Sequence, residues 1–189
     1  MLKIAFKEWA VVCRAIGEGR QTVILRKGGI AETGGVFRPE HDRFWLYPTH
    51  FHEQQQKGIR PEFLPMLEHV EATRPAPGTI AFTTFVEVTT VQFLDQLDAA
   101  LQLESLHIWS ADIVRQRFHY RTPGLYALTV RSHRLPTPVI VPEHPAYAGC
   151  KTWVDLEEAI DDRGAKVFSP PVCGGIKGGW SLPPGSGSC

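Results

Sequence analysis

The spacing of apolar residues predicts a mixture of short helices and strands along the first half of the chain. Apolar residues three and four positions apart predict an amphipathic helix at the start, ending at Gly17: Phe6, Trp9, Cys13 and Ile16. Alternation with a period of two then predicts a strand from Gln21 to Lys27 and another from Arg43 to Tyr47, which Pro48 ends. From Glu53 to Gly78 the chain is polar and rich in proline, and it favours a long excursion with one short helix near Leu67.

Period-two alternation returns in the second half of the chain. It predicts a long half-buried strand from Thr79 to Val88 and a further strand from Leu125 to about Arg134, followed by Val139 to Val141. Between the two long strands the apolar spacing becomes helical: Val91, Leu94, Leu97 and Leu101. Thr152 and Asp155 resemble a capping box, which predicts a last helix that ends at Gly164.

This order of elements shows no βαβ rhythm, and it predicts an α+β fold. We expect a small, mostly antiparallel curved sheet or barrel with helices packed on its outside and ends. Residues 1–168 are expected to form a single globular domain, and residues 169–189 a flexible tail rich in Gly, Pro and Ser. The glycine pairs lack the spacing of a Rossmann or P-loop motif, so nucleotide folds of those kinds are excluded.

Composition places the chain among ordinary globular proteins. Its 189 residues are 43% hydrophobic and 21% charged, which excludes a disordered, fibrous or disulfide-framework chain. No apolar run approaches the roughly 18 residues of a membrane span, and the start lacks the apolar core of a signal peptide. The four cysteines show no CxxC spacing and are expected to be reduced thiols. We therefore expect a cytoplasmic protein that does not associate with a membrane.

Charge is balanced overall but divided locally. Twenty Lys and Arg residues match twenty Asp and Glu residues. Residues 75–114 contain five acids and no Lys or Arg, whereas residues 113–142 contain five arginines and no acid. The two stretches either form ion pairs with each other on the surface, or the arginines form a basic face for an anion.

Cationic and aromatic residues are interleaved at several points. Arg26 and Lys27 precede Gly28 and Gly29, an arrangement typical either of an anion-binding loop or of a tight turn. Further candidates for contact with a nucleic acid are aromatic, His and Arg residues: Trp45, Tyr47, His52, His107, Trp109, Arg117 and Arg131. Aromatic faces stack on bases and cations bind phosphates, but the tryptophans are equally compatible with a core or rim role.

A hydrolytic site is the alternative that the histidines suggest. His50 and His52, with His107 or Cys150, could form a metal site, but an HxH pair without a further CxxC or HxxxH is weak evidence for one. We therefore predict no metal site and no cofactor, leave catalytic residues unassigned, and keep a metal-dependent hydrolase or nuclease as the alternative function.

Five ordered segments carry a resemblance to a known family. They are Ala5 to Ala10 (AFKEWA), Leu25 to Ile30 (LRKGGI), Phe44 to Thr49 (FWLYPT), His107 to Trp109 (HIW) and Gly149 to Leu156 (GCKTWVDL). Together they resemble a prokaryotic family catalogued as domain of unknown function 1802. That resemblance implies a setting in restriction-modification or related defence systems.

The layout of the second half is also similar to the PUA-like barrels, including the ASCH and EVE groups. The similarity rests on the strand from Thr79, the HIW segment and the strand from Leu125. It implies a barrel whose pocket takes nucleic acid or a modified base. We therefore expect a nucleic-acid-binding module that reads a base or modified base, with DNA or RNA as partner. A protein-interaction module of a larger defence system is a further alternative.

Overall fold

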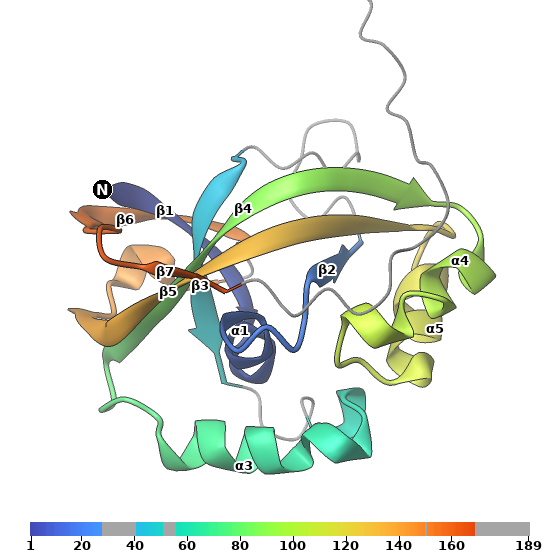
Figure 1. Ribbon diagram of the computed structural model, residues 1–189, viewed down its shortest axis with the longest axis horizontal. Coiled ribbons are helices and arrows are strands. Elements are labelled where there is room, and N and C mark those ends of the chain that lie inside the picture. Colours follow the sequence, from blue (N-terminus) through green and yellow to red (C-terminus); the bar gives the residue numbers. More distant parts are fainter. Residues whose placement is uncertain (28–40, 51–55, 150, 169–189) are drawn as a thin grey trace, which may run out of the picture.

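One seven-stranded sheet runs through the part of the chain that the computed structural model describes, residues 1–27, 41–50, 56–149 and 151–168 (Figure 1). Its strands are β1 (Leu2–Trp9), β2 (Val23–Arg26), β3 (Arg43–Thr49), β4 (Thr79–Leu94), β5 (Leu125–Pro142), β6 (Trp153–Ile160) and β7 (Lys166–Phe168). The strand order is β2-β5-β4-β3-β1-β6, with β7 paired to β5. Only β1 and β3 pair in parallel, and the other pairs are antiparallel.

Helices lie against one side and one end of this sheet. They are α1 (Ala10–Gly17), α3 (Leu64–Ala72), α4 (Leu97–Leu101) and α5 (Ala111–His119), with the 3₁₀ turns η1 (Pro61–Phe63), η2 (Glu104–Leu106) and η3 (Pro145–Tyr147). In Figure 1 the helix α1 lies under the arch of β4 and β5, α3 lies below it, and α4 and α5 pack at one end. None of these helices has the length and apolar character needed to cross a membrane.

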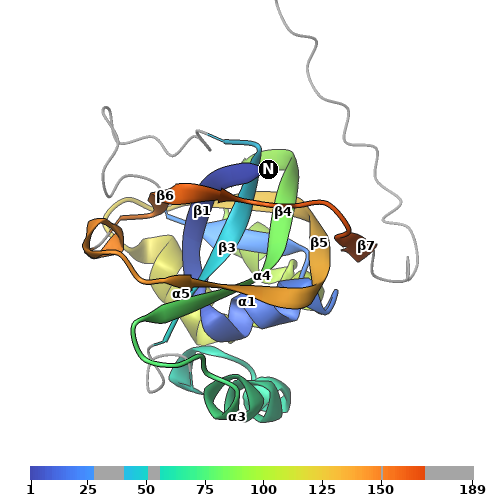
Figure 2. The ribbon, with the colours of Figure 1, turned by 90° about the vertical axis from the view of Figure 1, so that its left-hand side faces the viewer.

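The sheet is strongly curved, because its two longest strands bend together. β4 and β5 pair from Thr79 opposite Pro142 to Leu94 opposite Leu125, with register shifts near Thr84 and Thr90. Such irregularities bend a strand and increase its twist. Seen from the side in Figure 2, the strands wrap around the interior. The expected α+β fold with a mostly antiparallel curved sheet is confirmed.

The prediction of an initial helix from Phe6 is wrong for its first half, because residues 2–9 form β1 and the helix α1 starts only at Ala10. β1 lies between β3 and β6, inside the sheet. Neighbouring side chains such as Ala5 and Phe6 are therefore both fully buried, on opposite faces. A strand covered on both faces shows no alternation, and the spacing of its apolar residues imitated a helix.

The predicted last helix is also wrong, because residues 153–160 form β6. Val154 and Leu156 are buried, whereas Asp155 and Glu157 are exposed, so the side chains follow the period of two of a strand. Sheet pairing with β1 takes precedence over the local capping signal.

Three further boundaries differ from the sequence predictions. β3 continues past Pro48 to Thr49, β4 continues to Leu94 where a helix was expected from Val91, and β5 joins the two predicted strands into one. In each case hydrogen-bonded pairing with a neighbouring strand extends the strand past the residue at which the local sequence predicted its end.

Alternate residues of β3 contribute to two separate cores. Phe44 and Leu46 belong to the core beneath the sheet, where α1 packs, while Trp45 and Tyr47 belong to a second core on the other face. Gly17 at the end of α1 allows close approach to β4, since a Cβ there would lie 2.5 Å from Oγ1 of Thr84. The two cores leave polar side chains together at the end of the sheet near α5.

Candidate nucleic-acid interface

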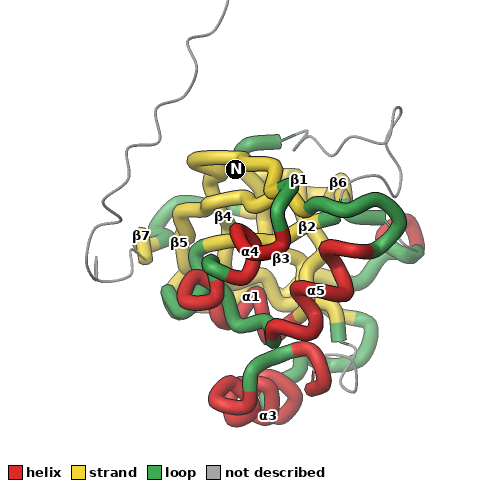
Figure 3. The backbone as a smooth tube through the Cα atoms, turned by 90° about the vertical axis from the view of Figure 1, so that its right-hand side faces the viewer, coloured by secondary structure: helices red, strands yellow, loops and turns green. Residues whose placement is uncertain are grey.

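A group of charged and aromatic side chains gathers where β1 and β2 end beside α5. We call it the arginine–tryptophan cluster, and it consists of Glu8, Trp9, Arg26, Trp109 and Arg117. In Figure 3 this end of the molecule faces the viewer, with α4 and α5 in front of the strands. The cluster contains three of the predicted site residues, from two widely separated parts of the sequence.

Arg117 is held by aromatic faces and by the backbone. Its guanidinium carbon lies 4.0 Å from the centre of the Trp109 ring and 5.5 Å from that of Trp9. Nη1 donates a hydrogen bond to the carbonyl of Leu25 at 3.2 Å. No other hydrogen bond of this guanidinium to a described residue is seen, and the side chain is partly buried.

Arg26 is held in the same way at the end of β2. Its guanidinium carbon lies 4.3 Å from the centre of the Phe6 ring, and Nη2 donates to the carbonyl of Lys7 at 2.9 Å. Nε is buried without a partner. Among the described residues, no carboxylate oxygen lies within 4 Å of either Arg26 or Arg117.

Glu8 is the buried anion of the cluster, with 3% of its surface exposed. Burial lowers the pKa of Arg117 to about 10; the charge of Glu8 acts against this change and that of Arg26 adds to it. Arg117 therefore stays protonated at neutral pH. The cluster thus holds two guanidinium groups and one carboxylate, which forms an ion pair with neither of them. Its net charge is positive.

The two tryptophans of the cluster support each other. The rings of Trp9 and Trp109 meet edge to face, with their centres 4.7 Å apart. Gly58 makes room for them, because a Cβ at that position would lie 2.8 Å from the Trp9 ring. A bridge between Ile59 and Trp109 holds the neighbouring backbone.

His107 lies behind the cluster rather than on its surface. Only 2% of it is exposed, and Nδ1 accepts a hydrogen bond from the backbone N–H of Trp109 at 3.2 Å. Burial and the charges of Arg60 and Arg117 lower its pKa to about 4, so the ring is neutral at pH 7. His107 therefore orients the backbone at Trp109, beside a cavity of about 170 Å³ that both residues line.

Lys27 binds backbone carbonyls at the end of α5. Its ammonium group donates to the carbonyls of Phe118 at 2.9 Å, Gly124 at 2.7 Å and Thr122. Burial lowers its pKa. These contacts fix the end of β2, and with it Arg26, against the C-terminal end of α5.

Trp45 and Tyr47 lie in the second core, apart from the cluster. Trp45 is fully buried against Phe82 and Phe85, and its Nε1 donates to the carbonyl of Leu2 at 3.1 Å. The hydroxyl of Tyr47 donates to Glu143 at 3.2 Å, and burial with that carboxylate raises the pKa of Tyr47. Protein atoms cover both rings, so neither offers a face to a base in this arrangement.

Arg131 lies further along β5 and is exposed on 56% of its side chain. It is five residues beyond Tyr126, which pairs with Arg26, and a strand of that length spans about 16 Å. Its Nη1 lies 3.8 Å from Glu87. The remaining predicted site residues, Gly28, Gly29 and His52, lie outside the described residues.

The ion-pair explanation of the divided charge applies to some of the arginines, and the basic face stays a prediction for others. Arg131 pairs with Glu87 and Arg115 with Asp112 at 3.1 Å, as the ion-pair explanation expects. Arg117 pairs with no described carboxylate and bonds a backbone carbonyl instead. Arg117, together with Arg26, is therefore the part of the predicted basic face that no described ion pair occupies.

The two described histidines of the hydrolase alternative, His50 and His107, do not converge, while His52 and Cys150 lie outside the described residues. Nδ1 of His50 lies 3.5 Å from Glu71, whereas His107 is enclosed beside Trp109. In residues 1–27, 41–50, 56–149 and 151–168, no three His, Cys, Asp or Glu side chains are grouped as metal ligands. No described observation favours a metal-dependent reaction.

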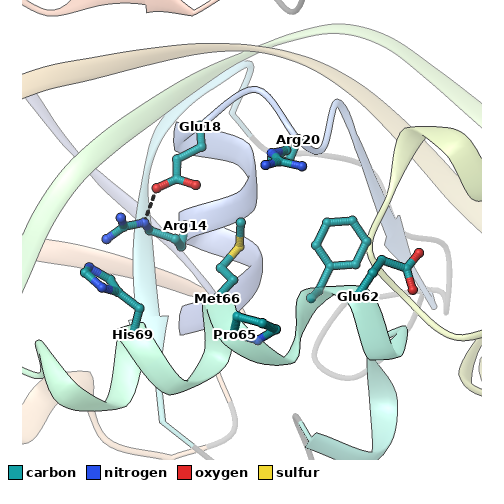
Figure 4. Close-up of a pocket in the computed structure, with 8 residues that line it drawn as sticks. Arg14, Glu18, Arg20, Glu62, Pro65, Met66 and His69 are labelled. Carbon is teal, nitrogen blue, oxygen red and sulfur yellow. Dashed lines mark hydrogen bonds and ion pairs between the residues drawn. The ribbon is translucent and has the colours of Figure 1, made fainter.

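A separate pocket of about 260 Å³ lies between α1 and α3 (Figure 4). Arg14 and Glu18 on one side form an ion pair, while Pro65, Met66 and His69 line the α3 side. The carboxylate of Glu18 neutralises the charge of Arg14. This pocket therefore attracts an anion less strongly than the arginine–tryptophan cluster does.

Two members of the cluster, Glu8 and Trp9, were absent from the predicted site. The apolar spacing of Phe6 and Trp9 assigned this segment to a core helix, which hid its place at the end of a strand. The signal that could have identified Glu8 is its position as the lone acid in the mostly apolar residues 1–17.

Comparisons with known proteins give a family and remote structural relatives. A family model described as "Domain of unknown function (DUF1802)" matches residues 5–171. No match is found among the curated proteins. The solved structures to which the chain is similar include ASCH from Zymomonas mobilis, at 15% identity and a TM-score of 0.46 over 82% of this chain and 87% of that one. A mutant of the same protein is 14% identical, with a TM-score of 0.48 over 82% of this chain and 88% of that one.

Proposed function

The chain belongs to the DUF1802 family, whose description assigns no activity, and from the arginine–tryptophan cluster we propose that it is a nucleic-acid-binding module. The observation that carries this proposal is the way Arg26 and Arg117 are held. Backbone carbonyls and aromatic rings fix both guanidinium groups, and no described carboxylate neutralises them by contact.

Such an arrangement fits a phosphate better than a role in stability alone. A guanidinium fork matches two phosphate oxygens, and the one described hydrogen bond of the Arg117 guanidinium uses only Nη1. Arg26 and Arg117 also repel each other: burial is the main cause of the lowered pKa of Arg117, and the charge of Arg26 adds to it. An anion bound between them removes this repulsion.

One aromatic member of the cluster suits the other part of a nucleotide. Trp9 is partly exposed and lies beside the guanidinium of Arg117, so a nucleotide whose phosphate meets Arg117 has this indole ring next to its base. Trp109 is buried, and its ring contacts and supports the guanidinium of Arg117. Reading of a base or modified base by this module, with DNA or RNA as partner, is part of the proposal. The proposal also includes a defence or restriction-modification setting, which the family resemblance supports, and a cytoplasmic location, which the composition supports.

The test measures affinity for fluorescein-labelled single-stranded and duplex oligonucleotides by anisotropy over a series of salt concentrations. We expect binding that weakens with salt. Arg26→Gln should weaken it severalfold for all sequences and lower the slope of log affinity against log salt by about one unit, as loss of one phosphate contact does. Arg26→Lys should keep the slope, because it keeps the charge.

Two variants serve as comparisons. Arg115→Ala removes an exposed arginine of α5 that pairs with Asp112, and it should leave affinity unchanged. Arg131→Ala decides between the two explanations of its charge, and its contact with Glu87 leads us to expect unchanged affinity with a small loss of stability. Absence of binding at low salt, or equal affinity of wild type and Arg26→Gln, would refute the proposal.

A further inference from the structure

The carboxylate of Glu8 has one satisfied and one unsatisfied oxygen. Oε1 accepts a hydrogen bond from the backbone N–H of Trp9 at 2.8 Å. Oε2 is buried and has no partner. The backbone carbonyl of Glu8 is fixed as well, since it accepts from Oγ1 of Thr49 at 3.0 Å. The residue is thus held in place with one strong acceptor unused.

A complementary unsatisfied donor lies in the same cluster. Nε of Arg26 is buried without a partner, although Nη2 of the same side chain donates to the carbonyl of Lys7, next to Glu8. A buried polar atom without a partner is costly, and most such atoms in native proteins are satisfied by protein, water or ligand. A molecule that offers a donor to Glu8 and an acceptor to Arg26 satisfies both atoms.

We propose that Glu8 determines base preference by accepting a hydrogen bond from the imino N–H of a keto base, thymine, uracil or guanine. This inference rests on the proposed function. Keto bases present that N–H directly beside a carbonyl oxygen, which can accept from Arg26. Adenine and cytosine present an unprotonated ring nitrogen at that position, and its lone pair repels the carboxylate.

Arg26 is attached in a way that allows its guanidinium to move. The guanidinium is held by one hydrogen bond to the Lys7 carbonyl and by the face of Phe6, without an ion pair to any described carboxylate. We propose that a phosphate draws the guanidinium outward from these two contacts and that this movement gives a base access to Oε2. Phosphate binding and base reading are in this way coupled through one side chain.

The experiment compares oligonucleotides of equal length made only of thymine, adenine or cytosine, together with a thymine oligonucleotide methylated at N3. Wild type should bind the thymine oligonucleotide about tenfold more tightly than the adenine and cytosine ones. N3-methylation, which removes the imino N–H, should abolish that preference. Glu8→Gln should also abolish it, because Oε1 of the amide meets the Trp9 N–H and its NH₂ then faces the base.

Glu18→Gln is the matched control, since Glu18 lies on α1 in an ion pair with Arg14 outside the cluster, and it should keep the preference. Equal binding of all four oligonucleotides by wild type would overturn this inference while leaving the proposed function standing. Absence of binding to any of them would instead remove the proposed function. If Glu8→Gln does not fold, the N3-methyl comparison on the wild-type protein still decides.

Discussion

Among single residues, Trp45 and Trp109 share a residue type and deep burial but have different neighbours. Trp45 packs against Phe82 and Phe85 in the second core, whereas Trp109 carries the guanidinium of Arg117 on its face. Trp45→Ala should therefore lower the free energy of unfolding by about 3–5 kcal/mol, as measured by urea denaturation. Tyr120→Ala, at a half-exposed ring, should cost no more than about 0.5 kcal/mol. Similar losses for both variants would contradict the assignment of Trp45 to the core.

His107 makes the protein sensitive to acid. Its pKa in the folded protein is about 4, below the ordinary value of 6.5. Between these two pH values the unfolded chain binds the additional proton, so stability falls as the pH is lowered from 6.5 to about 4. The loss from this residue is about 3 kcal/mol. It is absent above pH 6.5 and complete below about pH 4.

Denaturation at a series of pH values tests this prediction. His107→Asn keeps an acceptor for the Trp109 N–H but does not titrate, and its stability should change less between pH 6.5 and 4 than that of wild type. His119→Asn alters an exposed histidine and should leave the wild-type pH profile intact. A profile unchanged by His107→Asn would show that another group titrates.

At the scale of elements, the contact between β2 and the end of α5 depends on Lys27. Its ammonium group meets the carbonyls of Phe118, Thr122 and Gly124, which satisfy acceptors at and beyond the C-terminal end of the helix. Lys27→Met should cost about 1–3 kcal/mol and raise amide hydrogen exchange at residues 118–124. The exposed residue change Lys57→Met should alter neither quantity. Unchanged exchange in the Lys27 variant would exclude a capping role.

At the scale of the whole molecule, both cores are built on the same strands. β3 sends Phe44 and Leu46 to one core and Trp45 and Tyr47 to the other, and strands from Leu2 to Phe168 share one sheet. We therefore expect residues 1–168 to unfold as one cooperative unit. Tryptophan fluorescence and far-UV circular dichroism should report the same urea midpoint. Two separate transitions would indicate that the cores are independent.

Strands with one buried face could be recognised from the sequence alone. The alternation of Ile80 and Phe82 with more exposed neighbours predicted β4, because this pattern repeats every two residues. β3 was also predicted, from a short run of apolar residues that ends at Pro48, although both of its faces are buried. Arg26 was predicted to bind an anion from another local signal, since it stands shortly before two glycines at the end of a strand. The α+β class followed from these elements together.

Only the tertiary structure decided which residues meet. β1 sits inside the sheet and lacks alternation, and β6 carries a helix-like capping signal, so pairing partners alone define them as strands. The contact of Arg117 with Leu25 joins positions 92 residues apart. Whether an arginine pairs with a carboxylate or a tryptophan ring stays open to a ligand depends on such long-range neighbours, and spacing along the chain carries no information about them.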